Sequence, residues 1–189
     1  NGNGYSEAWV TEAKKRGLPS VKSWIESLKS MNTPEAHKLF EKYEVLSARE
    51  LESRYEVYVE TYAKHINIEA KTSIQMAKIL YIPAIIEYTG QLAEIVSAVE
   101  GAKADASVQK ELLNKVSGHL KSATQKLAKL ESETDAANGI ESVEKRADAF
   151  RDKVFTAQAA LREDIDALET IVPKALWPVP SYADMLFNF

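Results

Sequence analysis

The 189-residue chain contains no cysteine. Disulfide bonds, thiolate metal sites and a cysteine nucleophile are therefore excluded, and the absence suits a reducing compartment such as the cytoplasm. The chain also lacks a strong excess of either charge, because 24 Lys and Arg face 28 Asp and Glu, a formal net charge of -4. This balance gives no general attraction to nucleic acid or to anionic lipid, so we expect neither as a partner.

Long hydrophobic runs are missing as well. The longest wholly apolar run extends from Ile79 to Ile86, between Lys78 and Glu87, and a membrane helix needs roughly 20 such residues. We therefore expect no membrane association. The chain begins with Asn1-Gly2-Asn3-Gly4 rather than with Met or a signal peptide, and we interpret it as a piece of a longer polypeptide.

Hydrophobic residues make up 45% of the chain and charged residues 28%, which is ordinary for a folded protein. Residues 1–45 carry signals for short helices: Ser6 and Ser20 as N-caps, Gly17 as a stop, and Thr33-Pro34 as a third start. We interpret this aromatic-rich segment as the edge of something larger.

A capping box at Ser47-Ala48-Arg49-Glu50 predicts the start of a long helix. Its apolar stripe consists of Leu51, Tyr55, Tyr58, Tyr62, Ile66, Ala70, Ile74, Ala77 and Tyr81, and after Pro83 of Ile86, Ala93, Val96 and Val99. Because helical spacing persists on both sides of Pro83, we expect a kink there rather than a stop.

Two further long helices follow. The second carries Leu112, Leu113, Val116, Leu120, Leu127 and Leu130 and should end at Asn138-Gly139, where glycine tolerates a left-handed C-cap. The third has the most regular stripe, Ile140, Val143, Ala147, Phe150, Val154, Ala157, Leu161, Ile165, Leu168 and Val172, with the three-and-four spacing of a coiled-coil seam. No strand-like alternation competes. The predicted fold is all-α: an elongated antiparallel bundle of three long helices over residues 46–174, preceded by a cluster of short helices.

Metal chemistry finds little support in the sequence. A di-iron carboxylate bundle needs Glu-x-x-His motifs, and none of the three histidines has a glutamate three residues earlier. His65 and Glu69 lie one helical turn apart and could hold a metal ion together. Because no further ligands accompany them, a solvated or packed histidine is the better interpretation. Glu52, Glu56 and Glu60 recur every four residues, which favours an exposed acidic face.

Other catalytic motifs are equally weak. Gly2-x-Gly4 lacks the third glycine and the preceding strand of a phosphate loop. Ser117 and His119 lack the elbow that presents a nucleophile, and Tyr55, Tyr58 and Tyr62 have core spacing. We expect no catalytic, cofactor-binding or metal-binding residue, and we interpret the chain as an adaptor or assembly module.

The last segment, residues 175–189, is rich in proline and aromatic residues. Pro173, Pro178 and Pro180 favour an extended path, and Ser181 with Asp184 can cap a last short helix. Its apolar anchors are Trp177, Tyr182, Leu186 and Phe187. We predict a docking tail that latches to another subunit. The alternative is that the tail folds back on its own bundle or on the Trp9 and Trp24 cluster.

Three stretches carry a family resemblance: NGNGYSEAWVTEAKKRGLP, LSARELESRYEVYVETYAKHINIEA and ALWPVPSYADMLF. In order and spacing they resemble the C-terminal region of type III glutamine synthetases, over nearly the whole chain. The resemblance implies a large bacterial ligase that joins ammonia to glutamate with ATP and divalent metal ions such as Mg, and that assembles as two stacked hexameric rings. The family's metal, substrate and nucleotide residues match no stretch here.

The resemblance therefore implies a non-catalytic C-terminal domain with a role in assembly, whose partners are the rest of the parent chain and neighbouring subunits. Residues 1–45 would form the last layer of the catalytic body. Two alternatives stay open: a regulatory domain that binds an effector or partner protein, and an independent coiled-coil adaptor.

Overall fold

The computed structural model describes residues 3–187, and all regular structure among them is helical, which confirms the predicted all-α fold. Contacts divide the chain into two compact units, and the division falls between Tyr62 and Ala63. This position lies inside a helix, α4 (Ala48–Met76). The boundaries that we predicted at residues 45/46 and 174/175 stay predictions.

The first unit contains short helices and the beginning of α4. The short helices are α1 (Glu7–Lys15), α2 (Trp24–Lys29), the 3-10 turn η1 (Ser30–Asn32) and α3 (Pro34–Lys42). Ser6 and Thr33 cap α1 and α3 as predicted. Helix α2 begins after Ser23 rather than after Ser20, because the Ser23 hydroxyl accepts a hydrogen bond from the Glu26 backbone amide. Gly17 follows α1 with φ 70°, a left-handed conformation that glycine adopts without strain.

The core of the first unit lies where α2 packs against the first half of α4. Ile25 and Leu28 are buried, and the Trp24 ring lies 6.2 Å from the rings of both Tyr58 and Tyr62. The capping box at the start of α4 is present: the Ser47 amide donates to Glu50, and the Glu50 amide donates to Ser47 Oγ.

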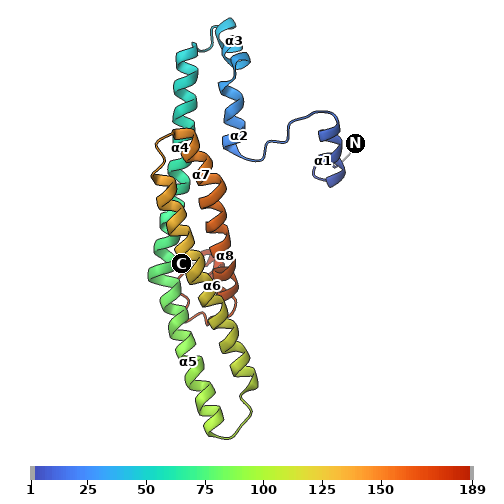
Figure 1. The fold of residues 1–189 in the computed structure, drawn as a ribbon. Helices are drawn as coiled ribbons and strands as arrows, with labels where there is room; N and C mark the ends of the chain where they lie inside the picture. The colour runs from blue at the N-terminus through green and yellow to red at the C-terminus, as the bar shows by residue number, and fades with distance from the viewer. Residues whose placement is uncertain (1–2, 188–189) are drawn as a thin grey trace. The chain divides into compact units, whose positions relative to one another are not determined.

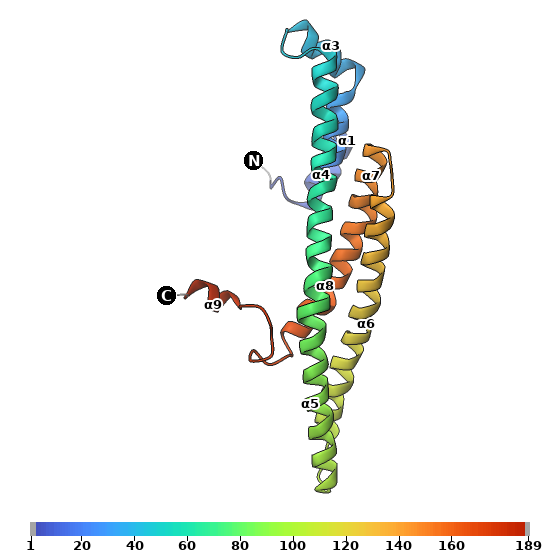
Figure 2. The same ribbon diagram turned by 90° about the vertical axis from the view of Figure 1, so that its left-hand side faces the viewer.

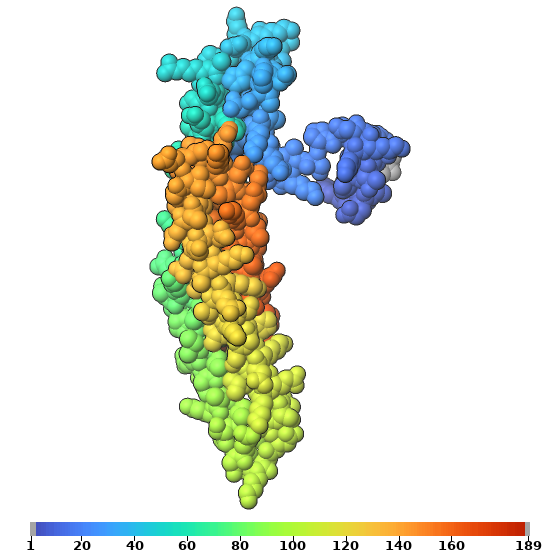
Figure 3. All heavy atoms as spheres, in the orientation of Figure 1, coloured from blue at the N-terminus to red at the C-terminus, as the bar shows by residue number. Residues whose placement is uncertain are grey.

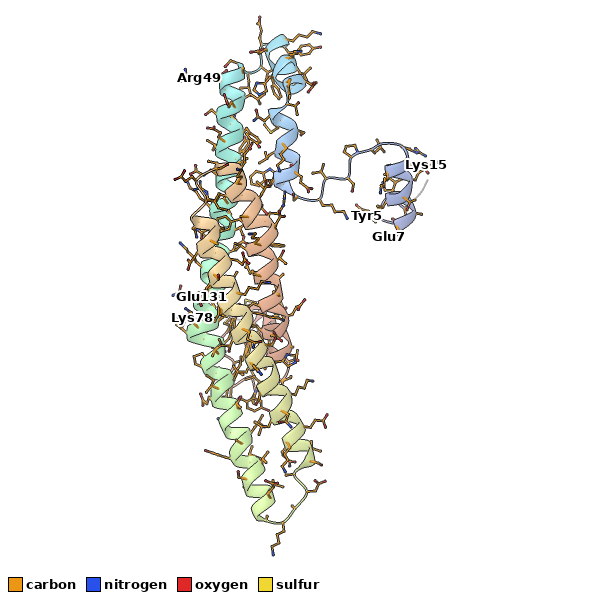
Figure 4. All side chains as sticks on the ribbon, viewed as in Figure 1. Tyr5, Glu7, Lys15, Arg49, Lys78 and Glu131 are labelled. Atoms are coloured by element: carbon orange, nitrogen blue, oxygen red, sulfur yellow. The ribbon has the colours of Figure 1, made fainter. Side chains whose placement is uncertain are left out.

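The second unit is a helical bundle. It contains the end of α4, the π-helical turn η2 (Ala77–Tyr81), α5 (Ile82–Gly101), α6 (Ser107–Asn138), α7 (Val143–Ala149), a second π-helical turn η3 (Phe150–Val154), α8 (Phe155–Glu169) and α9 (Tyr182–Leu186). Figures 1 and 2 show α5 and α6 as an antiparallel hairpin and α8 packed along α6. Lys78 of η2 and Glu131 of α6 form an ion pair across this bundle (Figure 4).

Residues Ala48–Gly101 form one run of helix, so continuation through Pro83 is confirmed. The helix is irregular at η2, which ends at Tyr81, two residues before Pro83. Proline has no backbone N–H group to donate, and the wider π turn changes the pattern of backbone hydrogen bonds just before Pro83. The kink near Pro83 stays a prediction.

The third predicted helix is divided by η3, which the sequence pattern did not predict. Its seam is buried from Ala147 to Val172, including Phe150 and Val154 of η3 itself. The second helix ends at Asn138 as predicted, but Gly139 has φ -75° and closes it in a right-handed conformation. The expected left-handed glycine cap was therefore wrong.

The apolar stripe of the first long helix was partly misassigned. Val59, Ala63, Ile85 and Leu92 are buried, whereas Tyr58, Ile86 and Ala93 are exposed. In each case adjacent residues are both apolar, so spacing alone does not select the buried one.

Three isoleucines of η2 and α5 remain uncovered in the second unit. Ile79, Ile86 and Ile95 are exposed, and Figure 3 shows that α5 and α6 (green and yellow) continue past the end of α8 as a pair. By length and composition, the helix Ala48–Gly101 is the one candidate membrane span among the described residues, with a window of mean hydropathy 1.2 that is 17% buried. Absence of membrane association stays a prediction.

Candidate docking site in the C-terminal tail

The tail begins where α8 ends, and proline determines its path. The chain turns after Pro173, whose carbonyl accepts the backbone amides of Leu176 and Trp177 at 2.9 and 3.1 Å. Pro178 and Pro180 then prevent helix until Ser181. The tail lies in the second unit, and Figure 2 shows α9 standing away from α5 to α8.

Trp177 attaches the root of the tail to the bundle. Its ring stacks on Tyr81 of η2, with a centroid distance of 5.1 Å and an interplanar angle of 27°. Such offset stacking is favourable beyond the area that it buries. The indole Nε1 is buried and has no hydrogen-bond partner among residues 3–187.

Helix α9 is short but well capped. The Asp184 amide donates to Ser181 Oγ, and the Ser181 amide donates to the Asp184 carboxylate at 2.9 Å. Lys174 Nζ lies 2.6 Å from Asp184 Oδ1. The Lys174 ammonium and the Ser181 hydroxyl and amide lower the pKa of Asp184 to about 2. The helix is therefore fixed at its N-terminus and tied back to the segment before Trp177.

The predicted docking residues fall into two groups. Trp177 packs on its own bundle, as the fold-back alternative expected, whereas Tyr182, Leu186 and Phe187 are 82%, 74% and 71% exposed. We call these three residues the tail tip. Phe189, which the tail sequence also includes, lies outside the described residues. Docking of the tail tip on another surface stays a prediction.

Sequence reasoning missed a polar cluster around Asp164, which is 6% exposed on α8. Its carboxylate accepts hydrogen bonds from His119 Nδ1 at 2.9 Å and Ser122 Oγ at 2.6 Å, and Lys126 Nζ lies at 2.8 Å. Burial raises the pKa of Asp164, but the hydrogen bonds from Lys126, Ser122 and His119 outweigh it and the pKa falls to about 2. The sequence feature that could have indicated this cluster is an aspartate placed between two apolar residues of the seam, Leu161 and Leu168.

The cluster does not have the geometry of a catalytic triad. In a triad the serine donates to the histidine, which is held in turn by the carboxylate. Here Ser122 and His119 both donate to Asp164, and these two residues and Lys126 all lie on α6. The arrangement links α6 to α8. Ser117, which the sequence placed near His119, is not part of it.

The weaker sequence candidates are not brought together. His65, Glu69, Glu52 and Glu56 are exposed, and no group of three or more metal-ligating side chains occurs in the described part of the chain. Tyr55 is buried, and Tyr58 and Tyr62 contact Trp24, which supports packing. Gly2 of Gly2-x-Gly4 lies outside the described residues.

Comparisons with known proteins give one consistent result. A family model described as glutamine synthetase C-terminal domain matches residues 1–100. The glutamine synthetase of Butyrivibrio fibrisolvens is 30% identical over 100% of this chain and 27% of its own length. That of Bacteroides fragilis is 28% identical over 99% of the chain and 26% of its length. The type-3 glutamine synthetase of Dictyostelium discoideum is 33% identical over 99% of the chain and 26% of its length. The chain thus spans about a quarter of the length of these relatives.

Proposed function

Because the chain belongs to the glutamine synthetase C-terminal domain family, we propose that it is the non-catalytic C-terminal region of a type III glutamine synthetase and serves its assembly. The parent enzyme would form glutamine from glutamate and ammonia with hydrolysis of ATP to ADP and phosphate. Two relatives are named glutamine synthetase and a third type-3 glutamine synthetase. The parent would act in the cytoplasm, in nitrogen metabolism.

We assign ATP and the divalent metal to the part of the parent outside this chain. A divalent cation such as Mg requires several oxygen ligands that converge, and the described residues contain no group of three metal-ligating side chains. The described residues therefore do not offer a ligand set that fits the metal.

The observation that carries the assembly role is the tail tip. Tyr182, Leu186 and Phe187 are exposed on and just after a helix that is already capped and tied to Lys174. A preformed segment loses less conformational freedom on docking than a flexible one, and an exposed cluster of large apolar side chains commonly marks an interaction site.

The three segments would then have separate roles. Residues 1–45 would complete the catalytic body, residues 46–174 would form the appended bundle, and residues 175–189 would dock on a neighbouring subunit. The assembly that the resemblance implies is a dodecamer of two stacked hexameric rings.

The test uses the longer protein that contains this chain. Replacing the three tip residues together, Tyr182→Ser, Leu186→Ser and Phe187→Ser, should lower the mass of the assembly measured by light scattering. The matched control is Val108→Ser, which changes an equally exposed apolar residue on α6. An unchanged mass in the tip variant would contradict the proposal, and so would an equal loss in the control.

A second test addresses the absence of catalysis. The isolated 189-residue chain, assayed for ATP-dependent glutamine formation, should show no turnover. Measured turnover would refute the division of labour between this chain and the rest of the parent.

A regulatory role is the second candidate, and one observation favours it. The second unit contains a cavity of about 290 Å³ lined in part by Ala77, Tyr81 and Leu161, which is the kind of feature that an effector would use.

A further inference from the structure

Uncovered apolar side chains are concentrated in the short-helix segment of the first unit. Within residues 3–46 the only buried apolar side chains are Ile25 and Leu28. Nine large apolar side chains of the same segment are exposed: Tyr5, Trp9, Val10, Leu18, Val21, Trp24, Leu39, Tyr43 and Val45. The first five of these lie in α1 or within a few residues of it. A concentration of this kind marks a surface that another part of a protein covers.

Helix α1 is specified at both ends by local signals. At its start, Ser6 Oγ accepts the Trp9 backbone amide at 3.3 Å. At its end, the Leu18 amide donates to the Ala13 carbonyl at 2.9 Å, and Gly17 has φ 70°. This hydrogen bond and this left-handed glycine are those of a Schellman cap. The sequence therefore encodes a helix of defined length at this position.

No side chain of α1 is buried, although the helix is only nine residues long. Isolated helices shorter than about 12 to 15 residues are marginally stable in water, and helices in proteins gain most of their stability from packing an apolar face. Among residues 3–187 nothing buries such a face on α1. The missing cover must therefore come from outside these residues.

The face that needs a cover is a single stripe. Trp9, Val10 and Ala13 lie within about 100° around the helix axis, because they are one, three and four positions apart. Trp9 and Val10 are 39% and 46% exposed. Thr11 lies on the opposite side of the helix, and Figure 4 marks this part of the chain by the labels Tyr5, Glu7 and Lys15.

The surface beside Trp9 is hollowed. An open hollow of about 450 Å³ is lined by Asn3, Gly4, Ser6, Ala8, Trp9 and Glu12. It has room for an apolar side chain of a covering surface, which would pack against the Trp9 ring. The stripe and the hollow together form a docking face.

The comparisons indicate what covers this face. The matched family is described as a C-terminal domain, and the chain spans only 26% to 27% of the length of its relatives. Most of the remaining length of such a protein precedes residue 1. A segment joined to a folded body by a short linker has a millimolar effective concentration at that body's surface. The preceding part of the same polypeptide is therefore favoured over a neighbouring subunit.

We propose that α1 docks through Trp9, Val10 and Ala13 on an apolar surface of the polypeptide that precedes residue 1 in the same chain. The inference rests on the proposed function, because it requires the longer parent protein. It adds the helix, the face and the occupant. Helix α1 would hold the first unit against the chain's own catalytic part, while the tail tip contacts a neighbouring subunit.

Photocrosslinking in the longer protein identifies the occupant. With Val10→p-benzoylphenylalanine, irradiation should join residue 10 to a peptide that precedes residue 1, and the product should keep the mass of one subunit in denaturing electrophoresis. Thr11→p-benzoylphenylalanine is the matched control, because Thr11 is exposed on the opposite side of the same helix. It should not give this product.

Hydrogen–deuterium exchange provides a measurement without substitution at α1. The backbone amides of residues 7–15 should exchange at least about tenfold more slowly in the longer protein than in the isolated 189-residue chain, because docking suppresses local opening. This protection should persist in the tip variant with Tyr182→Ser, Leu186→Ser and Phe187→Ser, since the cover belongs to the same polypeptide.

Four results would overturn the proposal: a Val10 product with the mass of two subunits, Val10 crosslinks confined to residues 1–189, equal crosslinking from Thr11, or equally fast exchange of residues 7–15 in both proteins. Failure of the assembly role is a separate result. It would appear as an unchanged mass in the tip variant, with residues 7–15 still protected.

Discussion

Phe150 and Phe187 are the same residue type in opposite surroundings. Phe150 lies in η3 on the seam of the bundle and is 1% exposed, whereas Phe187 follows α9 and is 71% exposed. Both belong to apolar patterns that are equally clear in the sequence. The comparison teaches that an apolar pattern predicts a covered surface, but does not say whether the cover is part of the same chain.

The largest expected effect is that of truncating the seam phenylalanine. Phe150→Ala removes a fully buried ring and should lower the free energy of unfolding by about 3 to 5 kcal/mol. Chemical denaturation followed by circular dichroism measures this. Phe155→Ala, one turn later and half exposed, is the control. A loss below about 1 kcal/mol for Phe150→Ala would mean that the seam is not packed as described.

The next effect concerns the only buried carboxylate that we find among residues 3–187. Asp164→Ala leaves His119, Ser122 and Lys126 without their acceptor. It should lower the free energy of unfolding by about 1 to 3 kcal/mol. Asp166→Asn changes an exposed, ion-paired carboxylate two residues further along the same helix and should lower the free energy of unfolding by less than about 1 kcal/mol. Equal costs at both positions would contradict a role for Asp164 in joining α6 to α8.

The same cluster predicts a pH dependence. Because the pKa of Asp164 is lowered from 3.8 to about 2 on folding, its contribution is present above the unfolded pKa and is lost as the pH falls through the folded pKa. The difference in stability between the unsubstituted chain and Asp164→Asn should be constant above about pH 5 and should shrink toward pH 2. A difference that persists down to the lowest accessible pH would contradict the assigned hydrogen bonds.

The root of the tail should give a smaller effect than the seam. Trp177→Ala removes a half-buried ring and its stack on Tyr81. It should lower the free energy of unfolding by about 1 to 2 kcal/mol. Thermal unfolding measures it, and Trp9→Ala in the first unit is the matched tryptophan control. No change for Trp177→Ala would show that the stack does not hold the tail on the bundle.

The smallest effect on stability is expected at the tail tip. Tyr182→Ser, Leu186→Ser and Phe187→Ser together should change the free energy of unfolding of the chain by less than about 0.5 kcal/mol per residue, because these side chains are exposed. A larger loss would mean that the tip packs on its own bundle in solution, which would favour the fold-back alternative for the whole tail.

Much of the fold could be predicted because the signals are local. The caps at Ser6, Thr33, Ser47 and Ser181 and the end of α6 at Asn138 follow from side chains within a few residues. The seam from Ala147 to Val172 follows from periodicity. The family resemblance, confirmed by the match over residues 1–100, identified the chain independently of these signals.

The parts that could not be predicted depend on contacts between helices. Ile85 rather than Ile86 is buried because of what packs against α5, and the pattern of two adjacent isoleucines does not contain that information. His119 and Ser122, which donate to Asp164, lie more than 40 residues away on α6. The cavity at Tyr81 depends on η2, and the stack of Trp177 on Tyr81 depends on how the tail turns after Pro173.

The central claim is that the tail tip is exposed in this chain because its cover belongs to another part of the assembly. Hydrogen–deuterium exchange of residues 181–187 tests it most directly, measured in the isolated chain and in the longer assembled protein. We predict fast exchange in the isolated chain and strong protection in the assembly, with unchanged protection along α6. Equally fast exchange of residues 181–187 in both would contradict the account.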